Sequence, residues 1–407
     1  MKLISDIHTI LRAKDSSWKR NLLIIVFAQF IAMAGMSACV PFLPLYVREL
    51  GITDMNQVKF WSGIVFSGPY IMAIFAVPFW GTLGDKYGRK LMVVRAIFGL
   101  VVAMFLMGFA QNVVQLFLLR IFQGFASGFV AATLSFISAE TPGERTGYAI
   151  GLLQSSQFAG TILGPLLGGL MSDFAGIRPV FFLVAALCLI SGILILLFVK
   201  ENNFVKQKDY KFSTLSNLKH LLSVPEIRTI LLLIILAQAG IHFTTSVFPY
   251  FVEQLHAPPE FLSSITGFLL AIVGFFSIIF APRWGKQNDK KNYRKIIPIT
   301  TTVVGLATVA QLIVSDWYLL IPFRILIGIF IAGILPTFYS ALSKKSQNKT
   351  IGSNMSIASS ATFLGAFLSF ITCAYMSSHF GIETIFVVSG IILLIIPIFL
   401  LLSPKLN

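Results

Sequence analysis

Four ionisable side chains lie deep inside long apolar stretches of this sequence, where a charge is expensive and usually has a function; they are Arg95, Arg120, His242 and Arg324. A buried arginine can bind a carbonyl oxygen or an anion, and a histidine can gain or lose a proton near neutral pH. Arg95 is about one turn from the end of its stretch, so its long side chain can reach the polar boundary, and a structural role is expected. The other three are candidates for proton or anion chemistry.

Carboxylates do not accompany these candidates. All 16 aspartates and glutamates fall in polar connections or at the ends of apolar stretches, whereas proton-driven membrane proteins usually hold an acid inside the bilayer. The proton carriers that remain are His242, whose unperturbed pKa is about 6.5, acids at the stretch ends such as Glu140 and Asp316, and the bound solute itself. A neutral, hydrogen-bonded His242 and a purely structural Arg120 are the alternative interpretations.

Uncharged polar residues and a proline in the same stretches are predicted to line a cavity, together with Phe and Met side chains that supply apolar surface. They are Gln29, Pro41, Gln123, Gln154, Gln157, Gln238 and Asn354. Patterns typical of enzymes are missing from the sequence: it has no nucleophile elbow, phosphate-binding loop or paired carboxylates, and its three cysteines lack metal-ligand spacing. An enzyme, a metal site and a cofactor are therefore not expected.

The composition predicts the elements that must carry these residues. Of 407 residues, 56% are hydrophobic and 12% are charged, with a mean hydropathy of +0.85, whereas soluble domains are about a quarter charged. Stretches of about 20 apolar residues predict membrane-spanning helices. Twelve are found, at 21–47, 58–80, 91–110, 113–136, 147–170, 179–199, 227–252, 261–281, 296–314, 317–340, 351–375 and 383–402. We expect an all-α membrane protein with six-helix domains at 1–199 and 227–407, joined by a polar loop at 200–226.

The net charge of +15 has a topological explanation. If the N-terminus is cytoplasmic, 25 of the 31 lysines and arginines fall on the cytoplasmic side, three on the opposite side and three within spans. This bias orients membrane proteins and predicts that both chain ends are cytoplasmic. No basic stripe interleaved with aromatic residues is present, so nucleic acid is not an expected partner. The expected partners are the lipid bilayer, a small-molecule substrate and protons, and the chain is expected to be a monomer.

The two six-span halves resemble each other at a fixed spacing. Residues that recur 204 positions later include Gly63, Trp80, Gly81, Asp85, Lys86, Arg120 and Gly124, which match Gly267, Trp284, Gly285, Asp289, Lys290, Arg324 and Gly328, and Pro41 matches Pro249 at an offset of 208. Agreement at one offset, in corresponding spans, argues for duplication. Parallel repeats of this kind predict two pseudo-symmetric bundles around an axis along the membrane normal, with a binding region between them.

A glycine-rich segment between the second and third spans carries an acid and a base four residues apart. Its glycines allow a tight turn, and the acid and base can pair or cap a helix. The segment, Gly81-Thr-Leu-Gly84-Asp85-Lys-Tyr-Gly88-Arg89-Lys90, resembles the signature loop of the major facilitator superfamily. The resemblance implies a gating loop made of Gly81, Gly84, Asp85, Gly88, Arg89 and Lys90. The second-half equivalent at 285–294 keeps one of the three glycines, and no full gating role is expected for it.

Other segments extend the resemblance. Arg120-x-x-Gln123-Gly124 in span four resembles a second motif of the superfamily, and Pro41-Phe-Leu-Pro44 resembles the first-helix motif of its twelve-span drug:proton antiporters. The span-five sequence that resembles an antiporter motif is Gly160-x-x-x-Gly164-Pro165-x-x-Gly168-Gly169. Small residues let two helices touch, and the proline bends its helix. Segments within residues 18–182 look similar to multidrug exporters of Gram-negative inner membranes.

The resemblance implies a secondary transporter in the bacterial inner membrane. It would export small amphipathic compounds in exchange for protons by alternating access, with Arg120, His242, Glu140 and Arg324 as candidates for coupling. The sequence departs from some drug antiporters because its first span has no acid. Within transport, the alternatives are a dedicated exporter of one metabolite, such as a siderophore, and an importer. From another class, the alternative is a membrane sensor or assembly factor that keeps the fold without transporting.

Overall fold

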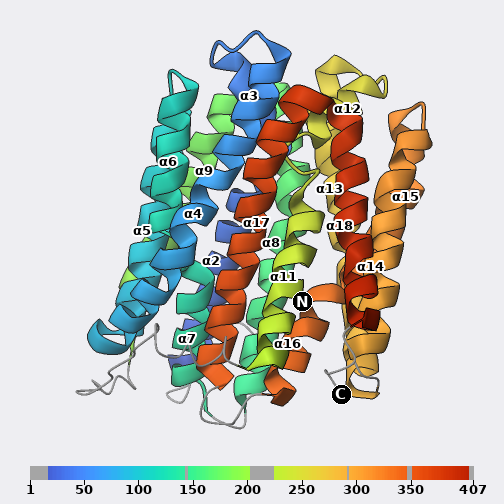
Figure 1. Ribbon diagram of the computed structural model, residues 1–407. Helices are drawn as coiled ribbons and strands as arrows, with labels where there is room; N and C mark the ends of the chain where they lie inside the picture. Colours follow the sequence, from blue (N-terminus) through green and yellow to red (C-terminus); the bar gives the residue numbers. More distant parts are fainter. Residues whose placement is uncertain (1–16, 143–144, 202–223, 291–292, 346–350, 403–407) are drawn as a thin grey trace, which may run out of the picture.

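The computed structural model describes residues 17–142, 145–201, 224–290, 293–345 and 351–402. The described chain is built of helices that stand side by side in a bundle (Figure 1). The first half comprises α2 (Ser17–Ala38), α3 (Leu43–Glu49), α4 (Met55–Tyr87), α5 (Arg89–Gly108), α6 (Val113–Phe125), α7 (Phe129–Glu140), α8 (Thr146–Ala175) and α9 (Ile177–Phe198). The second half comprises α11 (Pro225–His242), α12 (Phe248–Gln254), η2 (Pro259–Phe261), α13 (Leu262–Lys290), α14 (Tyr293–Ala310), η3 (Gln311–Ile313), η4 (Trp317–Leu320), α15 (Ile321–Ile331), α16 (Ile334–Lys345), α17 (Ile351–Phe380) and α18 (Ile382–Leu402).

Twelve segments of the described chain are long and apolar enough to cross a bilayer, six in each half. This confirms the predicted all-α class and number of spans. The outward faces carry large apolar side chains, among them Phe75, Phe174 and Leu197, which are 69%, 78% and 64% exposed. Apolar side chains at that exposure are stable only against lipid, so the hydrophobic excess of the sequence covers the outside of the bundle.

Spans one, four, seven and ten each contain a break in the helix, which the sequence analysis did not predict. The breaks lie at 39–42, 126–128, 243–247 and 332–333. Pro44 and Pro249 stand in the first turns of α3 and α12, where their missing amide hydrogens cost nothing. Gly128 takes a left-handed backbone with φ of +102° before α7. The breaks fall in corresponding spans of the two halves.

The glycine-rich segment forms a shorter turn than the sequence predicts. Helix α4 continues through Gly81 and Gly84 as far as Tyr87, and α5 begins at Arg89. The chain reverses at Gly88 alone, whose φ of +111° is rarely open to residues with a side chain. The apolar part of α4 that could cross a bilayer ends at Gly81, in agreement with the predicted span end at residue 80, and the helix itself continues beyond it because the first two glycines are helical.

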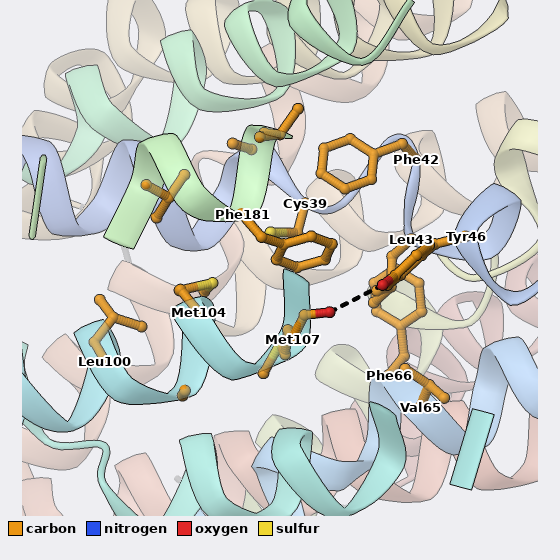
Figure 2. Packing of buried hydrophobic residues seen from close by; sticks show 14 of the residues in the cluster. Cys39, Phe42, Leu43, Tyr46, Val65, Phe66, Leu100, Met104, Met107 and Phe181 are labelled. Carbon is orange, nitrogen blue, oxygen red and sulfur yellow. Dashed lines mark hydrogen bonds between the residues drawn. The ribbon is translucent and has the colours of Figure 1, made fainter. Parts of the chain in front are cut away.

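The interior of the first half is filled by aromatic and aliphatic side chains from spans one, three and six. The Phe181 ring lies 5.6 Å from that of Phe42 and 5.3 Å from that of Tyr46. The Tyr46 hydroxyl donates a hydrogen bond of 2.9 Å to the Met107 carbonyl oxygen, drawn as the dashed line in Figure 2. This bond satisfies a buried hydroxyl and ties α3 to the end of α5.

One hydrogen bond occurs at equivalent places in both halves. The indole nitrogen of Trp80 donates to the Phe125 carbonyl oxygen, and that of Trp284 donates to the Ile329 carbonyl oxygen, each at 2.7 Å. Donor and acceptor are both shifted by 204 residues, the offset found in the sequence. In each half the bond satisfies a carbonyl near the break of the fourth span, where the regular helix cannot.

Candidate functional site

Five rings from both halves meet midway along the bundle; we call Phe66, Tyr70, His242, Phe363 and Phe370 the aromatic cluster. The Tyr70 ring, on α4, lies 6.2 Å from the His242 ring, on α11. Phe370, on α17, stacks on Phe66 at 5.2 Å and lies 5.7 Å from His242. Tyr70, His242 and Phe363 are only half-buried although they lie in the interior of the protein. The cluster therefore joins aromatic side chains of α4 in the first half to those of α11 and α17 in the second.

Arg120 lies next to this cluster and is held by its own half. Its Nη1 donates to Oε1 of Gln123 at 2.7 Å, and its Nε donates to the Val65 carbonyl oxygen at 3.4 Å. The guanidinium carbon is 6.0 Å from the centre of the Phe66 ring. A backbone carbonyl and Gln123 thus supply the acceptors that a buried arginine requires. The two residues had been predicted separately, as a coupling and a cavity residue.

Arg324, the repeat counterpart of Arg120, has a different environment. Its guanidinium carbon lies 3.6 Å above the centre of the Phe248 ring. Its Nε and Nη2 are buried and have no hydrogen-bond partner among the described residues. The position equivalent to Gln123 in the 204-residue repeat is Ile327, which cannot accept a hydrogen bond.

Arg95 has the structural role that was expected, though not by reaching the polar boundary. Its guanidinium donates to the carbonyl oxygens of Ala126 and Ser127, in the break between α6 and α7. The Trp80 ring lies 3.8 Å from the guanidinium carbon on one side. Arg95 thus satisfies backbone oxygens that the interrupted helix leaves free.

The predicted antiporter motif lies where α8 meets helices of both halves. A Cβ at Gly160 would meet the Phe30 carbonyl oxygen, and one at Gly164 would meet the Ala34 carbonyl oxygen, both on α2. At Gly169 it would collide with the Ser263 carbonyl oxygen of α13, in the other half. The remaining motif residues, Pro165 and Gly168, make similar close approaches, to Gly267 and Ala38. The motif packs α2, α8 and α13 together without gaps.

The turn of the predicted gating loop is fixed by a residue that the sequence analysis missed. Both carboxylate oxygens of Glu201, just beyond α9, accept hydrogen bonds from the first amides of α5, those of Arg89 and Lys90, at 2.9 and 3.1 Å. A carboxylate at a helix N-terminus is favourable because it faces the positive end of the helix dipole. The Lys90 ammonium donates to the Leu196 carbonyl oxygen. The side chain of Asp85 lies outside the described part of the structure.

Polar contacts join the halves at the end of the bundle that carries α3 and α12 (Figure 1). Arg48 forms an ion pair with Glu253 at 3.1 Å. The Tyr250 hydroxyl donates to the Pro44 carbonyl oxygen at 2.6 Å and lies 3.1 Å from the Ser62 hydroxyl. We call these five residues the α3–α12 gate. Residues 48 and 253, and Tyr250, had not been predicted, since single charges and aromatics at span ends carry no distinctive pattern.

A second junction of the halves lies between α8 and α13. The carboxylate of Asp173 accepts hydrogen bonds from the amides of Ser263 and Ser264, at 3.2 and 2.7 Å. The acid caps a helix of the other half, whose first amides would otherwise lack acceptors.

The other predicted residues are scattered. Gln29 is fully buried and accepts a hydrogen bond from Thr133, so it lies inside the first half. Gln238 is buried against Gly365 of α17. Pro41 is buried at the break in span one, Gln154 and Gln157 are half-buried on α8, and Glu140 is buried at the end of α7. The side chain of Asn354 lies outside the described residues. Among the residues described, no group of three or more His, Cys, Asp or Glu could hold a metal ion.

Comparison with known proteins places the chain in a class. It matches the Major Facilitator Superfamily over residues 25–277 and again over 230–406, and it belongs to that family. It is therefore a multi-pass membrane transporter of small molecules and not an enzyme. The expected resemblance is confirmed.

Particular relatives are multidrug resistance proteins. The chain is 32% identical over 376 residues to "Multidrug resistance protein MdtG" of Proteus mirabilis, covering 92% of this chain and 94% of the relative. It is 30% identical over 378 residues to the protein of that name from Salmonella typhimurium, at 93% and 94% coverage. Solved structures with the same fold include the nucleoside transporter NupG, with a TM-score of 0.80 and 15% identity, covering 95% of this chain and 100% of the other. A bacterial homologue of the lysosomal transporter Spinster gives 0.78 and 14%, covering 95% and 96%.

Proposed function

We propose that this transporter exports small amphipathic compounds from the bacterial cytoplasm in exchange for protons, by alternating access. The observation that carries the proposal is the similarity to multidrug resistance proteins over more than nine-tenths of the chain. The fold alone does not select this function, because a nucleoside transporter shares it.

The aromatic cluster suits an amphipathic substrate. Its partly exposed rings offer apolar surface on both halves, and His242 adds one titratable group. Pockets that bind drug-like molecules are typically apolar with few polar groups. A compound bound here would contact α4 of the first half and α11 and α17 of the second, so its binding would respond to their relative movement.

The α3–α12 gate defines the conformation. Its ion pair and hydrogen bonds close one end of the interface between the halves. We infer from the distribution of lysine and arginine that the opposite end, with the Gly88 turn, faces the cytoplasm. With the α3–α12 gate closed, we take the structure to represent the state that loads from the cytoplasm. Export then requires the gate to open while the cytoplasmic ends approach each other.

Within this mechanism, His242 carries the proton. It is the one ring of the aromatic cluster whose side-chain type has an unperturbed pKa near neutral pH, where cells maintain proton gradients. Arg120 acts on the same region from behind Phe66, while the Gly160–Gly169 segment serves as the tightly packed joint of α2, α8 and α13. The joint and the six-helix domains at 1–199 and 227–407 would move as units around the substrate.

The test is accumulation of a fluorescent amphipathic dye in an efflux-deficient bacterial host. Cells that express the wild-type protein should retain several-fold less dye than cells without it, and a protonophore should abolish the difference. A host that expresses the protein in its membrane and retains as much dye as the empty host would contradict the proposal. Dye efflux that continues in the presence of the protonophore would support export and contradict coupling to protons.

A further inference from the structure

Arg324 is a buried cation whose hydrogen-bonding edge has no partner in the described protein. The residue is 7% exposed, and its guanidinium covers the Phe248 ring at 3.6 Å. The two orphaned nitrogens, Nε and Nη2, lie along one edge of the planar guanidinium. That edge presents two parallel N–H bonds, the arrangement that matches two oxygens of a carboxylate or phosphate.

The repeat provides an internal reference for this site. Arg120 uses Nε and Nη1 to bind the Val65 carbonyl oxygen and Gln123. In the second half, Ile327 replaces the amide one turn further along the helix, and no described carboxylate pairs with Arg324. Arg120 thus has acceptors within its own half, on α4 and α6, whereas Nε and Nη2 of Arg324 have none among the described residues.

Physical chemistry makes an unfilled site of this kind unfavourable unless a ligand completes it. A desolvated guanidinium without a counter-charge costs several kcal/mol, and its free N–H groups add to that cost. The Phe248 ring stabilises one face of the cation but cannot accept from the edge. Among the described residues no carboxylate and no acceptor is supplied to this edge, so a ligand is the remaining source of the counter-charge.

We propose that the Nε–Nη2 edge of Arg324 binds the anionic group of the transported compound, a carboxylate or a phosphate-like group. This assignment rests on the proposed transport function and narrows its substrate class to amphipathic organic anions. The apolar part of such a compound would lie among aromatic side chains. The anionic group would bind in the second half, on the face of α15 that Phe248 adjoins.

The experiment compares two probes of nearly the same shape, 4-phenylbutyrate and its neutral amide, by titration calorimetry with purified protein in phosphatidylcholine nanodiscs; the amide lacks the charge and one of the two acceptor oxygens. Wild-type protein should bind the acid at least roughly tenfold more tightly than the amide, since a bidentate charge-assisted pair is worth about that much. Arg324→Gln should abolish the preference, and Arg324→Lys should keep part of it. A wild-type protein that binds the acid no more tightly than the amide overturns the proposal.

A second variant separates ligand binding from loss of charge or folding. Ile327→Gln recreates in the second half the amide that binds Nη1 of Arg120, so Arg324 stays charged and its Nε–Nη2 edge stays free. This variant should keep the preference for the acid and melt at least as high as the wild type. Arg178→Gln removes an exposed arginine of the first half and should also keep the preference. An unchanged preference in Arg324→Gln would overturn the assignment.

Two further measurements distinguish a transported solute from a lipid headgroup and separate failure of the anion site from failure of the transport function. Addition of phosphatidylglycerol to the nanodiscs should not compete with the acid; competition would make a lipid headgroup the ligand and overturn the assignment to a transported solute. Dye efflux by wild-type cells is measured in parallel. Its failure would contradict the transport function, whereas efflux combined with equal binding of acid and amide would contradict only the anion site.

Discussion

In the first half Arg120 is held by Gln123 and the Val65 carbonyl oxygen, whereas in the second half Arg324 lies on Phe248 with two nitrogens unpartnered. The halves share their broken spans and the bond from tryptophan to backbone, so the difference lies in side chains and not in the fold. In the first half Arg120 therefore has internal acceptors, whereas the second half keeps Arg324 available for a ligand and contributes His242 to the aromatic cluster.

The largest effect is expected where the halves share a joint. Gly164→Leu should abolish dye efflux, because a side chain there would collide with Ala34 and Ser37 of α2 and separate packed helices. Gly151→Leu, on the same helix with open space around its Cα, is the matched control and should transport normally. Efflux and membrane abundance are measured together; normal efflux by Gly164→Leu would show that close packing of α2 and α8 is dispensable.

The contrast between the two arginines can be measured as stability. Arg120→Leu should destabilise the purified protein by about 1–3 kcal/mol, because it leaves Gln123 and a carbonyl without a partner. Arg324→Leu should be neutral or stabilising without ligand, since it removes an unpaired buried charge. Thermal unfolding in detergent measures both variants. Equal destabilisation by the two substitutions would mean that the halves do not differ as described.

Substitution of His242 tests whether the aromatic cluster gives transport its dependence on pH. His242→Ala should flatten the dependence of transport on pH and reduce transport at neutral pH several-fold, while leaving binding of a neutral probe within about threefold of wild type. His379→Ala is the control, because His379 is exposed and bonded to neighbours on its own helix. A pH profile that His242→Ala leaves unchanged would eliminate this residue and direct attention to Glu140 and Asp85.

The smallest effect is expected at the α3–α12 gate. Arg48 and Glu253 are about one-third exposed, and ion pairs at such exposure contribute about 0–1 kcal/mol. Arg48→Ala should therefore change the transport rate only a few-fold, by shifting the balance between closed and open gate. Arg178→Ala, which breaks the pair with Glu49 within the first half, should leave the rate unchanged. Transport rates of the two variants are measured in proteoliposomes. Equal changes in rate would mean that the Arg48–Glu253 pair does not control opening of the gate.

Hydropathy and repeat spacing were sufficient to predict the all-α class and the twelve spans, six in each half. The number of spans can be counted from long apolar runs alone, because each run is long enough to cross a bilayer whatever it packs against. Twelve spans were therefore predicted correctly. The breaks were missed because hydropathy carries no information about backbone conformation. Gly128 and Pro249 lie near breaks, but the runs around them are apolar throughout. The end of the second span was predicted within one residue, whereas the continuation of α4 to Tyr87 was not, because glycines suggested a loop and two of the three are helical.

The centre was predictable only in part. Charged residues in apolar runs are rare, so Arg120 and His242 stood out, whereas Phe66 and Phe370 belong to a set of 39 phenylalanines with identical local patterns. Glu201 was placed in the polar loop, and nothing in its sequence neighbourhood indicates that it caps α5. The Gln123-to-Ile327 difference was present in the repeat but gains meaning only with the guanidinium contacts in view.

Alternating access is tested most directly by locking the gate. In the double variant Arg48→Cys/Glu253→Cys, a reducible bis-thiosulfonate crosslinker should join the halves and stop dye transport in proteoliposomes. Reduction of the crosslinker should restore dye transport. The matched pair Glu49→Cys/Arg178→Cys joins two positions of the first half and should transport normally when crosslinked. Transport at the uncrosslinked rate by the locked gate variant would contradict the account, because the halves would then carry substrate without separating at α3 and α12.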